Sequence, residues 1–206
     1  MRLGLFGGSF DPVHNGHLLL AETCREAARL DQVLFMPACV PPHKRDRSLS
    51  TATQRLEMLR LAIGGNEHFA LSSLELDRGG VSYTVDTLHQ LHAEDSAREL
   101  CLLLGADSLK DLPLWREPAE ICRLAELIVV RRPGLPPLDF SILSPFVAAE
   151  RIERFERSQV EMPLMELSST DLRQRAATGR SLRYRTPRAV EAYIHTHHLY
   201  QSADSS

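Results

Sequence analysis

Two adjacent glycines and two histidines follow the first apolar run of the chain, in the string GGSFDPVHNGH at residues 7–17. The glycines let backbone approach a ligand closely, because no Cβ stands in the way. Asn15 is the expected N-cap of a helix that begins at about Gly16, which places His14 and His17 beside its first turn. Free N–H groups and the macrodipole favour an anion there, and the two imidazoles add directional hydrogen-bond donors. The string therefore predicts a phosphate site whose charge stabilisation can grow as a transition state forms.

Other sites built from glycine and histidine fit this string less well. The dinucleotide fingerprint GxGxxG and the P-loop GxxxxGK[ST] are both missing from the string. A zinc site on His14 and His17 is a weaker alternative, because no thiol or acidic third ligand stands nearby at a usual spacing. A phosphate site is the interpretation that uses every part of the string.

A second helix start combines hydroxyl groups with a cation. Ser168, Ser169 and Thr170 stand where a helix is expected to begin, and Arg173 follows about one turn later on the same face. These groups can bind one anion together. A simple N-cap, with Asp171 favouring the helix dipole, would explain the serines without any ligand. Both interpretations fit the residues alone.

Three further segments carry side chains that suit a nucleotide. The stretch 37–50 is rich in proline and basic residues, so Lys44 is expected on a stiffened loop where it can meet phosphates; a solvated basic loop is the alternative. Asp107 follows an apolar run and can accept hydrogen bonds from ribose hydroxyls. Thr84 or Ser82 can cap a helix, and a helix start also suits a carboxylate ligand.

Strand-like and helix-like segments alternate along the chain, which predicts an α/β fold. We expect a Rossmann-like, doubly wound parallel sheet flanked by helices, with a small C-terminal helical part. The expected strands are 3–6, 33–36, 69–76, 100–104, 127–130 and 160–167, and the expected helices begin near 16, 56, 84, 119, 170 and 187. The last helix should bury a stripe of Val190, Tyr193, Ile194 and His197. The segment 135–159 carries no readable pattern.

The composition is that of an ordinary globular protein. The 206 residues suit one domain over 1–200 with a disordered tail at 201–206, and they are 43% hydrophobic and 25% charged. A net charge of −3 argues against a constitutive nucleic-acid binder. No apolar run approaches the ~20 residues of a membrane span, and the start is too quickly polar for a signal peptide. Four cysteines without a CxxC pair are expected to be buried thiols, so a cytoplasmic protein is predicted.

The string GGSFDPVHNGH resembles the T/HxGH signature of the nucleotidyltransferase superfamily, and its nearest match there is the bacterial nicotinate-mononucleotide adenylyltransferases. The segments MPACVPPHKRD, SYTVDTL, GADS, RPG (residues 132–134) and LSSTDLR also resemble that family. Leu167 and Leu172 stand where the family usually has isoleucine, which changes packing rather than chemistry. The resemblance runs from residue 1 to about 200 and is specific at its first and last motifs.

The resemblance implies transfer of the adenylyl group of ATP to nicotinate mononucleotide, giving deamido-NAD and pyrophosphate in NAD biosynthesis. The implied catalytic residues are His14, His17, Lys44 and Arg173. The implied ATP-binding residues are Gly7, Gly8, Ser9, Phe10, His17, Gly105, Asp107, Arg132, Ser168, Ser169, Thr170 and Arg173. The implied mononucleotide-binding residues are Lys44, Ser82, Tyr83, Thr84 and Trp115, although a single tryptophan is more often a core residue. Mg²⁺ would enter with ATP, without a strong metal site on the protein.

Several relatives and one different class of protein are the alternatives. Phosphopantetheine adenylyltransferases and cytidylyltransferases share the opening motif, but the PPHK, SYTVDTL and SSTDLR segments favour the nicotinate enzyme. Class I aminoacyl-tRNA synthetases share HxGH but are longer and carry a lysine loop that this chain lacks. A non-catalytic nucleotide-binding module would not need both the histidines and Arg173. The expected partners are small-molecule substrates, with no nucleic acid and no membrane; oligomeric state and the strength of preference for nicotinate stay open.

Overall fold

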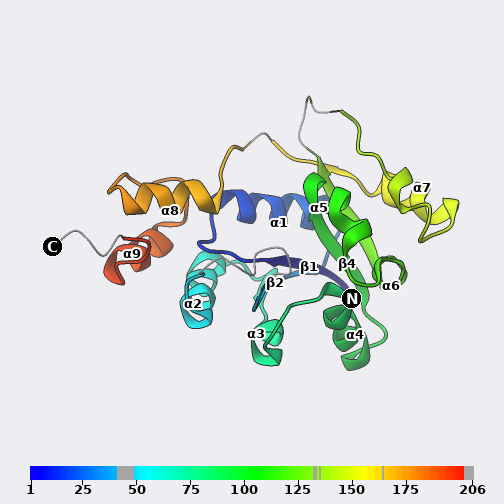
Figure 1. Ribbon diagram of the computed structural model, residues 1–206, viewed down its shortest axis with the longest axis horizontal. Helices are drawn as coiled ribbons and strands as arrows, with labels where there is room; N and C mark the ends of the chain where they lie inside the picture. The colour runs from blue at the N-terminus through cyan, green and yellow to red at the C-terminus, as the bar shows by residue number, and fades with distance from the viewer. Residues whose placement is uncertain (41–48, 132–133, 135, 164, 202–206) are drawn as a thin grey trace.

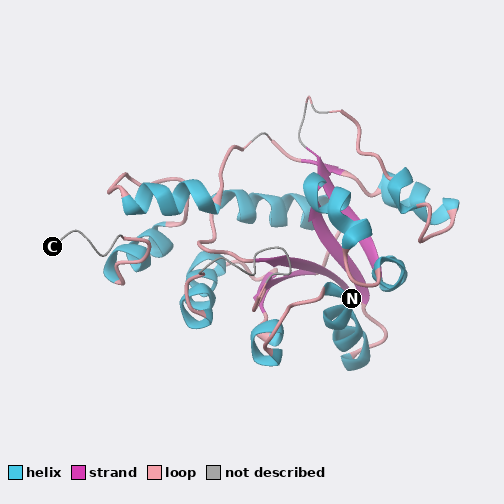
Figure 2. Ribbon diagram, viewed as in Figure 1, coloured by secondary structure: helices cyan, strands magenta, loops and turns pink. Residues whose placement is uncertain are grey.

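A parallel six-stranded sheet forms the centre of the computed structural model, which describes residues 1–40, 49–131, 134, 136–163 and 165–201 (Figure 2). The strands are β1 (Arg2–Gly8), β2 (Gln32–Pro37), β3 (Phe69–Leu71), β4 (Glu99–Gly105), β5 (Ala125–Arg131) and β6 (Val160–Glu161). Their order is β3-β2-β1-β4-β5-β6, and every neighbouring pair is parallel. The strand order reverses between β1 and β4, which is where open α/β sheets bind ligands. The predicted α/β, Rossmann-like fold is confirmed.

Helices cover both faces of the sheet (Figure 1). They are α1 (Asn15–Ala27), α2 (Ala52–Ile63), α3 (Leu74–Arg78), α4 (Thr84–Glu94), α5 (Ala106–Asp111), α6 (Pro118–Leu124), α7 (Ala149–Arg157), α8 (Ser169–Ala177) and α9 (Arg188–Thr196), with short 3-10 turns at Leu112–Leu114 and Ser141–Leu143. One apolar cluster joins the sheet to α1, α2, α8 and α9, and a second joins it to α4, α5, α6 and α7. The C-terminal helices therefore belong to the same layer as α1.

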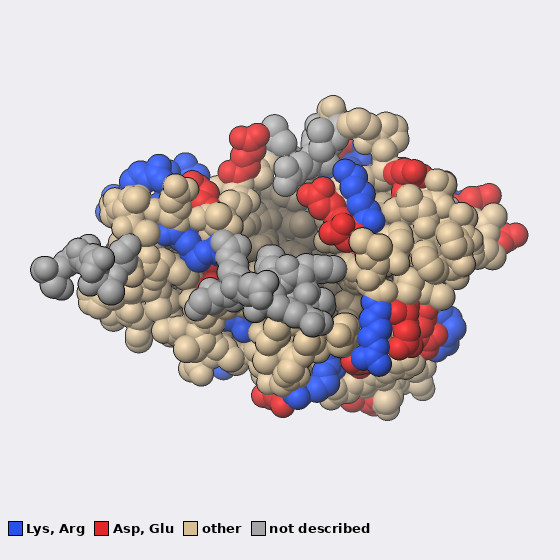
Figure 3. Space-filling view, in the orientation of Figure 1, with Lys and Arg blue, Asp and Glu red and all other residues tan. Residues whose placement is uncertain are grey.

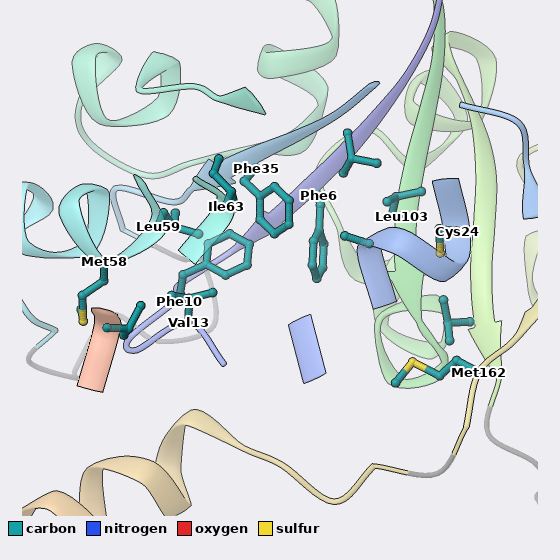
Figure 4. Packing of buried hydrophobic residues seen from close by; sticks show 14 of the residues in the cluster. Phe6, Phe10, Val13, Cys24, Phe35, Met58, Leu59, Ile63, Leu103 and Met162 are labelled. Atoms are coloured by element: carbon teal, nitrogen blue, oxygen red, sulfur yellow. The ribbon is translucent and has the colours of Figure 1, made fainter. Parts of the chain in front are cut away.

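Aromatic rings fill the first cluster beneath the start of α1 (Figure 4). The ring centroids of Phe6 and Phe10 lie 5.4 Å apart in an edge arrangement, and Phe35 is 5.4 Å from Phe6. Such pairs add stability beyond the area that they bury. The segment that carries the histidines thus packs on these buried aromatic rings.

Several predicted elements are shorter than expected or differ. The third strand ends at Leu71 because the Ser72 hydroxyl accepts a hydrogen bond from the backbone of Leu74 and starts α3 instead. The last strand is only two residues long, although the backbone N–H of Met162 still donates to the Arg131 carbonyl at 3.3 Å. The unassigned segment 135–159 contains α7, whose Phe155 is buried in the second cluster.

Two further expectations are corrected in part. In α9 the side chains of Val190 and Ile194 are buried, but His197 is exposed and ends the helix as its C-cap. All four cysteines are thiols, and Cys39 is half-buried rather than buried. No helix in the described part of the chain is long and apolar enough to cross a membrane.

Candidate active site

The turn between β1 and α1 is held in an unusual conformation. Phe10 has a φ of 46°, in the left-handed region that non-glycine residues adopt only at a cost of about 1–3 kcal/mol. Its ring is 1% exposed and fills the space beside Gly8, where an added Cβ would stand 3.1 Å from it. Packing of the Phe10 ring therefore fixes the turn, and a side chain at position 8 would press against that ring.

His14 and His17 cap the start of α1 through each other. The backbone N–H of His17 donates to Nδ1 of His14 at 3.3 Å, and the backbone N–H of His14 donates to Nδ1 of His17 at 3.2 Å. This is the reciprocal arrangement of a capping box, with histidines at both positions. The predicted N-cap was therefore wrong: His14 is the N-cap, and Asn15 instead donates from its side chain to the Tyr184 carbonyl at 2.7 Å.

The capping contacts define which nitrogen of each ring carries a proton. A nitrogen that accepts an N–H bond has its lone pair free, so in a neutral imidazole the proton is on the other nitrogen. We infer from these contacts that His14 and His17 both carry hydrogen on Nε2. Their rings stack at 3.6 Å with an interplanar angle of 17°. The result is two neutral N–H donors side by side at a helix N-terminus, which suits phosphate oxygens.

Burial keeps His14 neutral, and this makes stability depend on pH. Its burial lowers the pKa of His14 from the ordinary 6.5 to about 4. Between pH 4 and 6.5 the unfolded chain then binds more protons than the folded chain. The free energy of unfolding is therefore highest above pH 6.5 and decreases as the pH falls towards 4. We expect the free energy of unfolding to drop by about 3 kcal/mol more between pH 7 and pH 4 than in His14→Asn, which caps without titrating. Urea denaturation of both proteins at pH 7 and pH 4 measures these free energies of unfolding. An equal loss of stability in the two proteins would contradict the prediction.

Gly16 leaves room for the His14 ring. A Cβ at this position would stand 3.1 Å from Nδ1 and 3.2 Å from Cε1 of His14, and the ring cannot retreat because it is stacked on His17. We expect Gly16→Ala to lower kcat about 10-fold by displacing the imidazole. Stability should hold or rise, since alanine favours a helix by about 1 kcal/mol. Steady-state kinetics and thermal unfolding of the same preparation test both parts; full turnover would contradict the assigned ring position.

The start of α8 lies against residues 9–17, the segment that joins β1 to the first turn of α1 and that is called the histidine turn below. The Ser169 hydroxyl donates to the Pro12 carbonyl at 2.8 Å, and the Arg173 guanidinium donates to the Asp11 carbonyl at 2.5 Å and to the Thr170 hydroxyl at 3.0 Å. The hydroxyl of Ser168 accepts the backbone N–H of residue 171 at 3.1 Å, so the N-cap interpretation holds for this serine. The structure thus brings the two predicted anion sites together.

A cavity of about 320 Å³ opens beside this turn at the carboxyl ends of β1 and β4. It is lined by residues predicted for both substrates, namely Gly7, Gly8, Ser9, Gly105, Ser82, Tyr83, Thr84 and Trp115. Phe6 is one of the residues that line the cavity, and its ring lies 6.0 Å from the His17 ring, so the cavity lies close to the histidines. The molecule is hollowed near the centre of the face shown in Figure 3, between α1 and β1.

The helix start that borders this cavity is not capped as expected. Tyr83, not Thr84 or Ser82, is the N-cap of α4, and among the described residues no side chain caps it. The Ser82 hydroxyl instead accepts the backbone N–H of Cys39 at 2.8 Å. The first-turn N–H groups of this helix are consequently available to a ligand carboxylate.

Some of the predicted site residues are not seen at the cavity, and one residue that lines the cavity was not predicted. The Asp107 side chain is 96% exposed and 4.0 Å from Lys110, while Lys44 and Arg132 fall outside the described residues. Sequence reasoning missed Arg116, which lines the cavity with its guanidinium 4.9 Å from the Tyr83 ring centre. Arg116 directly follows the only tryptophan in the sequence, and this position could have indicated it.

Metal ligands do not gather in the described part of the chain. No group of three or more His, Cys, Asp or Glu side chains there could hold a metal ion. The Nδ1 atoms of His14 and His17 are already engaged by backbone N–H groups. A zinc site on these histidines would therefore lack its remaining ligands among these residues.

Comparisons with known proteins agree with the geometry. The model of the family described as cytidylyltransferase-like matches residues 5–175. The Thermomicrobium roseum protein named "Probable nicotinate-nucleotide adenylyltransferase" is 46% identical over 99% of this chain and 94% of its own length. The Roseiflexus sp. protein of the same name is 47% identical over 97% and 98%, respectively. The Plasmodium falciparum nicotinic acid mononucleotide adenylyltransferase complexed with NaAD is 17% identical, with a TM-score of 0.73 over 97% of each chain, which is a likeness of fold.

Proposed function

This chain belongs to the nicotinate-nucleotide adenylyltransferases within the cytidylyltransferase-like family, and we propose that it transfers adenylyl groups through hydrogen bonds from His14 and His17. The reaction joins the adenylyl group of ATP to nicotinate mononucleotide and releases pyrophosphate. The observation that carries the proposed roles is the reciprocal capping of the two histidines, which directs both Nε2–H groups away from the backbone. Such donors stabilise charge without themselves exchanging protons.

The chemistry needs neither a general base nor a covalent intermediate. A phosphate monoester is already nucleophilic at neutral pH, so its oxygen attacks the α-phosphorus of ATP directly and in line. Catalysis then depends on positioning and on charge stabilisation. His17 holds an α-phosphate oxygen and His14 binds the phosphates beside it. Lys44, Ser169 and Arg173 steady the β- and γ-phosphates and the departing pyrophosphate.

The cavity has features that suit the mononucleotide and the adenosine. The uncapped start of α4 offers N–H groups to the nicotinate carboxylate, and the Trp115 ring provides a stacking surface. Thr84, Tyr83 and Ser82 line the same wall. ATP contacts are assigned to Gly7, Gly8, Ser9, Phe10, Gly105, Asp107, Arg132, Ser168 and Thr170.

A divalent cation belongs with the nucleotide rather than with the protein. The described residues hold no cluster of carboxylates and imidazoles that would bind one alone. Mg²⁺ prefers phosphate oxygens and water in nucleotide sites, so we assign it to bound ATP, whose charge it neutralises. Residues 1–200 then act as one nucleotidyltransferase domain. The thiol state of all four cysteines is consistent with a cytoplasmic enzyme.

A substrate screen tests the proposed function. Pyrophosphate release is followed with ATP or CTP against nicotinate mononucleotide, nicotinamide mononucleotide and phosphopantetheine. We expect the highest kcat/KM with ATP and nicotinate mononucleotide. Preference for CTP, or for phosphopantetheine as acceptor, would overturn the assignment, and omission of Mg²⁺ should abolish the reaction with every pair.

A further inference from the structure

The C-terminal segment after residue 175 holds the histidine turn from one side. The match to the cytidylyltransferase-like family ends at that residue, so this segment lies outside the part shared with the family model. In the fold, α9 packs beside α2 and lies near the start of α1 (Figure 1). Side chains and carbonyls of this segment contact three residues of the turn.

Thr186 and two neighbouring carbonyls contact the turn next to the histidines. The Thr186 side chain is buried, and its hydroxyl donates to the Val13 carbonyl at 2.8 Å. The backbone N–H of Asn15 donates to the Arg185 carbonyl at 2.9 Å, and its side chain donates to the Tyr184 carbonyl. The residues on both sides of His14 are therefore held by one short stretch of chain.

Tyr200 contacts the other end of the turn. Its hydroxyl donates to Oδ1 of Asp11 at 2.6 Å, and the backbone N–H of Ser50 donates to Oδ2 of the same carboxylate at 3.2 Å. Asp11 is 1% exposed, so a missing partner would leave a buried carboxylate oxygen unsatisfied. Burial, assisted by the Asp11 carboxylate, raises the pKa of Tyr200 and keeps its hydroxyl protonated as a donor.

The backbone is strained where the segment meets the turn. Tyr184 has a φ of 63° and Tyr200 a φ of 66°, in the left-handed region that tyrosine rarely adopts. Tyr184 supplies its carbonyl there while its side chain is 92% exposed. Packing of the exposed ring cannot explain the conformation of Tyr184, and the carbonyl of this residue accepts a hydrogen bond from the Asn15 side chain. Strain of this kind persists where the surrounding structure requires one position of the chain.

We propose that residues 184–200 form a brace that positions His14 and His17 for adenylyl transfer, with Thr186 and Tyr200 as positioning residues. The inference rests on the proposed function of the two histidines. The brace acts on the turn that carries the histidines and does not line the mononucleotide cavity. Its loss should therefore lower kcat and leave the KM for the mononucleotide unchanged.

The test uses isosteric variants with matched controls. Thr186→Val and Tyr200→Phe each remove one hydroxyl from the brace. Thr178→Val and Tyr193→Phe remove hydroxyls from an exposed threonine and a half-buried tyrosine of the same region. Thr186→Ser keeps the donor and should restore activity. Rates are measured well below the lowest melting temperature, so that every variant is folded.

We expect kcat to fall about 10-fold in each brace variant, with the KM for nicotinate mononucleotide within twofold of the controls. The double variant should lose less than the product of the two single losses, because both act on one turn. Brace variants that only melt earlier, with kcat equal to the controls, would overturn the proposal.

A spectroscopic measurement tests the brace independently of the proposed function. ¹⁵N spectra of the histidine rings report which nitrogen carries hydrogen, with or without turnover. If the wild-type protein fails to adenylylate nicotinate mononucleotide, the proposed function is wrong, and these spectra still decide on the brace. Altered His14 and His17 signals in Thr186→Val and Tyr200→Phe, against unchanged signals in the controls, support it; unchanged signals in all variants overturn it.

Discussion

Replacing His17 with alanine should lower kcat by about 100-fold or more, which is the usual scale for losing one preorganised donor to a developing charge. In the structure His17 presents Nε2–H beside that of His14, since its Nδ1 is engaged by the His14 backbone. Alanine removes both the donor and half of the capping pair. Single-turnover kinetics with saturating ATP and nicotinate mononucleotide measure the loss.

A second substitution separates the capping role of His17 from its role in transfer. His17→Gln keeps an oxygen that can accept the His14 backbone N–H, as glutamine does at the third position of a capping box. It should therefore fold like the wild type but lose about as much turnover as the alanine variant. His89, an exposed histidine on α4, provides the control substitution. Nearly full turnover in His17→Gln would show that His17 acts only as a capping residue.

Replacing Arg173 with alanine should have the second largest effect, a loss of about 100-fold in kcat/KM for ATP. A charge-assisted contact to phosphate is stronger than a neutral one, and a guanidinium can supply two parallel bonds. Arg173 also donates to the Asp11 carbonyl, so its removal loosens the histidine turn as well. Initial rates with each substrate varied in turn provide the measurement.

The matched control for Arg173 lies on the same helix. Arg175 is half-buried and donates to the Ser181 carbonyl, so Arg175→Ala removes an equal charge from α8 away from the turn. Its kcat/KM for ATP should stay within twofold of the wild type. A defect in Arg173→Ala confined to the KM for the mononucleotide would count against the assigned role.

The sheet and the position of the glycine–histidine string could be predicted from the sequence, whereas the meeting of this string with the start of α8 was implied only by the family resemblance. Alternating apolar segments indicated parallel strands, and parallel strands bring their carboxyl ends to one edge. The glycine–histidine string follows β1, and the topology places it at the switch between β1 and β4. Local signals were enough here because each depends on residues only a few positions apart.

The capping of α1 shows where local reasoning failed. Asn15 was expected as the N-cap because asparagine favours that position. His14 occupies it instead, since two imidazoles three residues apart can satisfy each other's backbone. The spacing of a capping box between His14 and His17 was a usable signal that residue preferences alone obscured.

The brace could not be predicted because its contacts join residues far apart in sequence. Tyr200 meets Asp11 across 189 positions, and Thr186 meets Val13 across 173. Neither pair has a charge pattern or motif that indicates its partner. The same holds for Arg55, whose buried guanidinium donates to the carbonyls of Ser9 and Ala38 and thereby ties two loops together.

In the proposed mechanism His14 and His17 stabilise a direct transfer and never carry the adenylyl group. The stereochemistry at the α-phosphorus distinguishes direct transfer from transfer through the protein, using ATP made chiral there by one sulfur in place of oxygen. A single in-line attack by nicotinate mononucleotide predicts inversion of configuration in the dinucleotide product. Retention would require two successive displacements, through an adenylylated residue of the protein, and would rule out direct transfer.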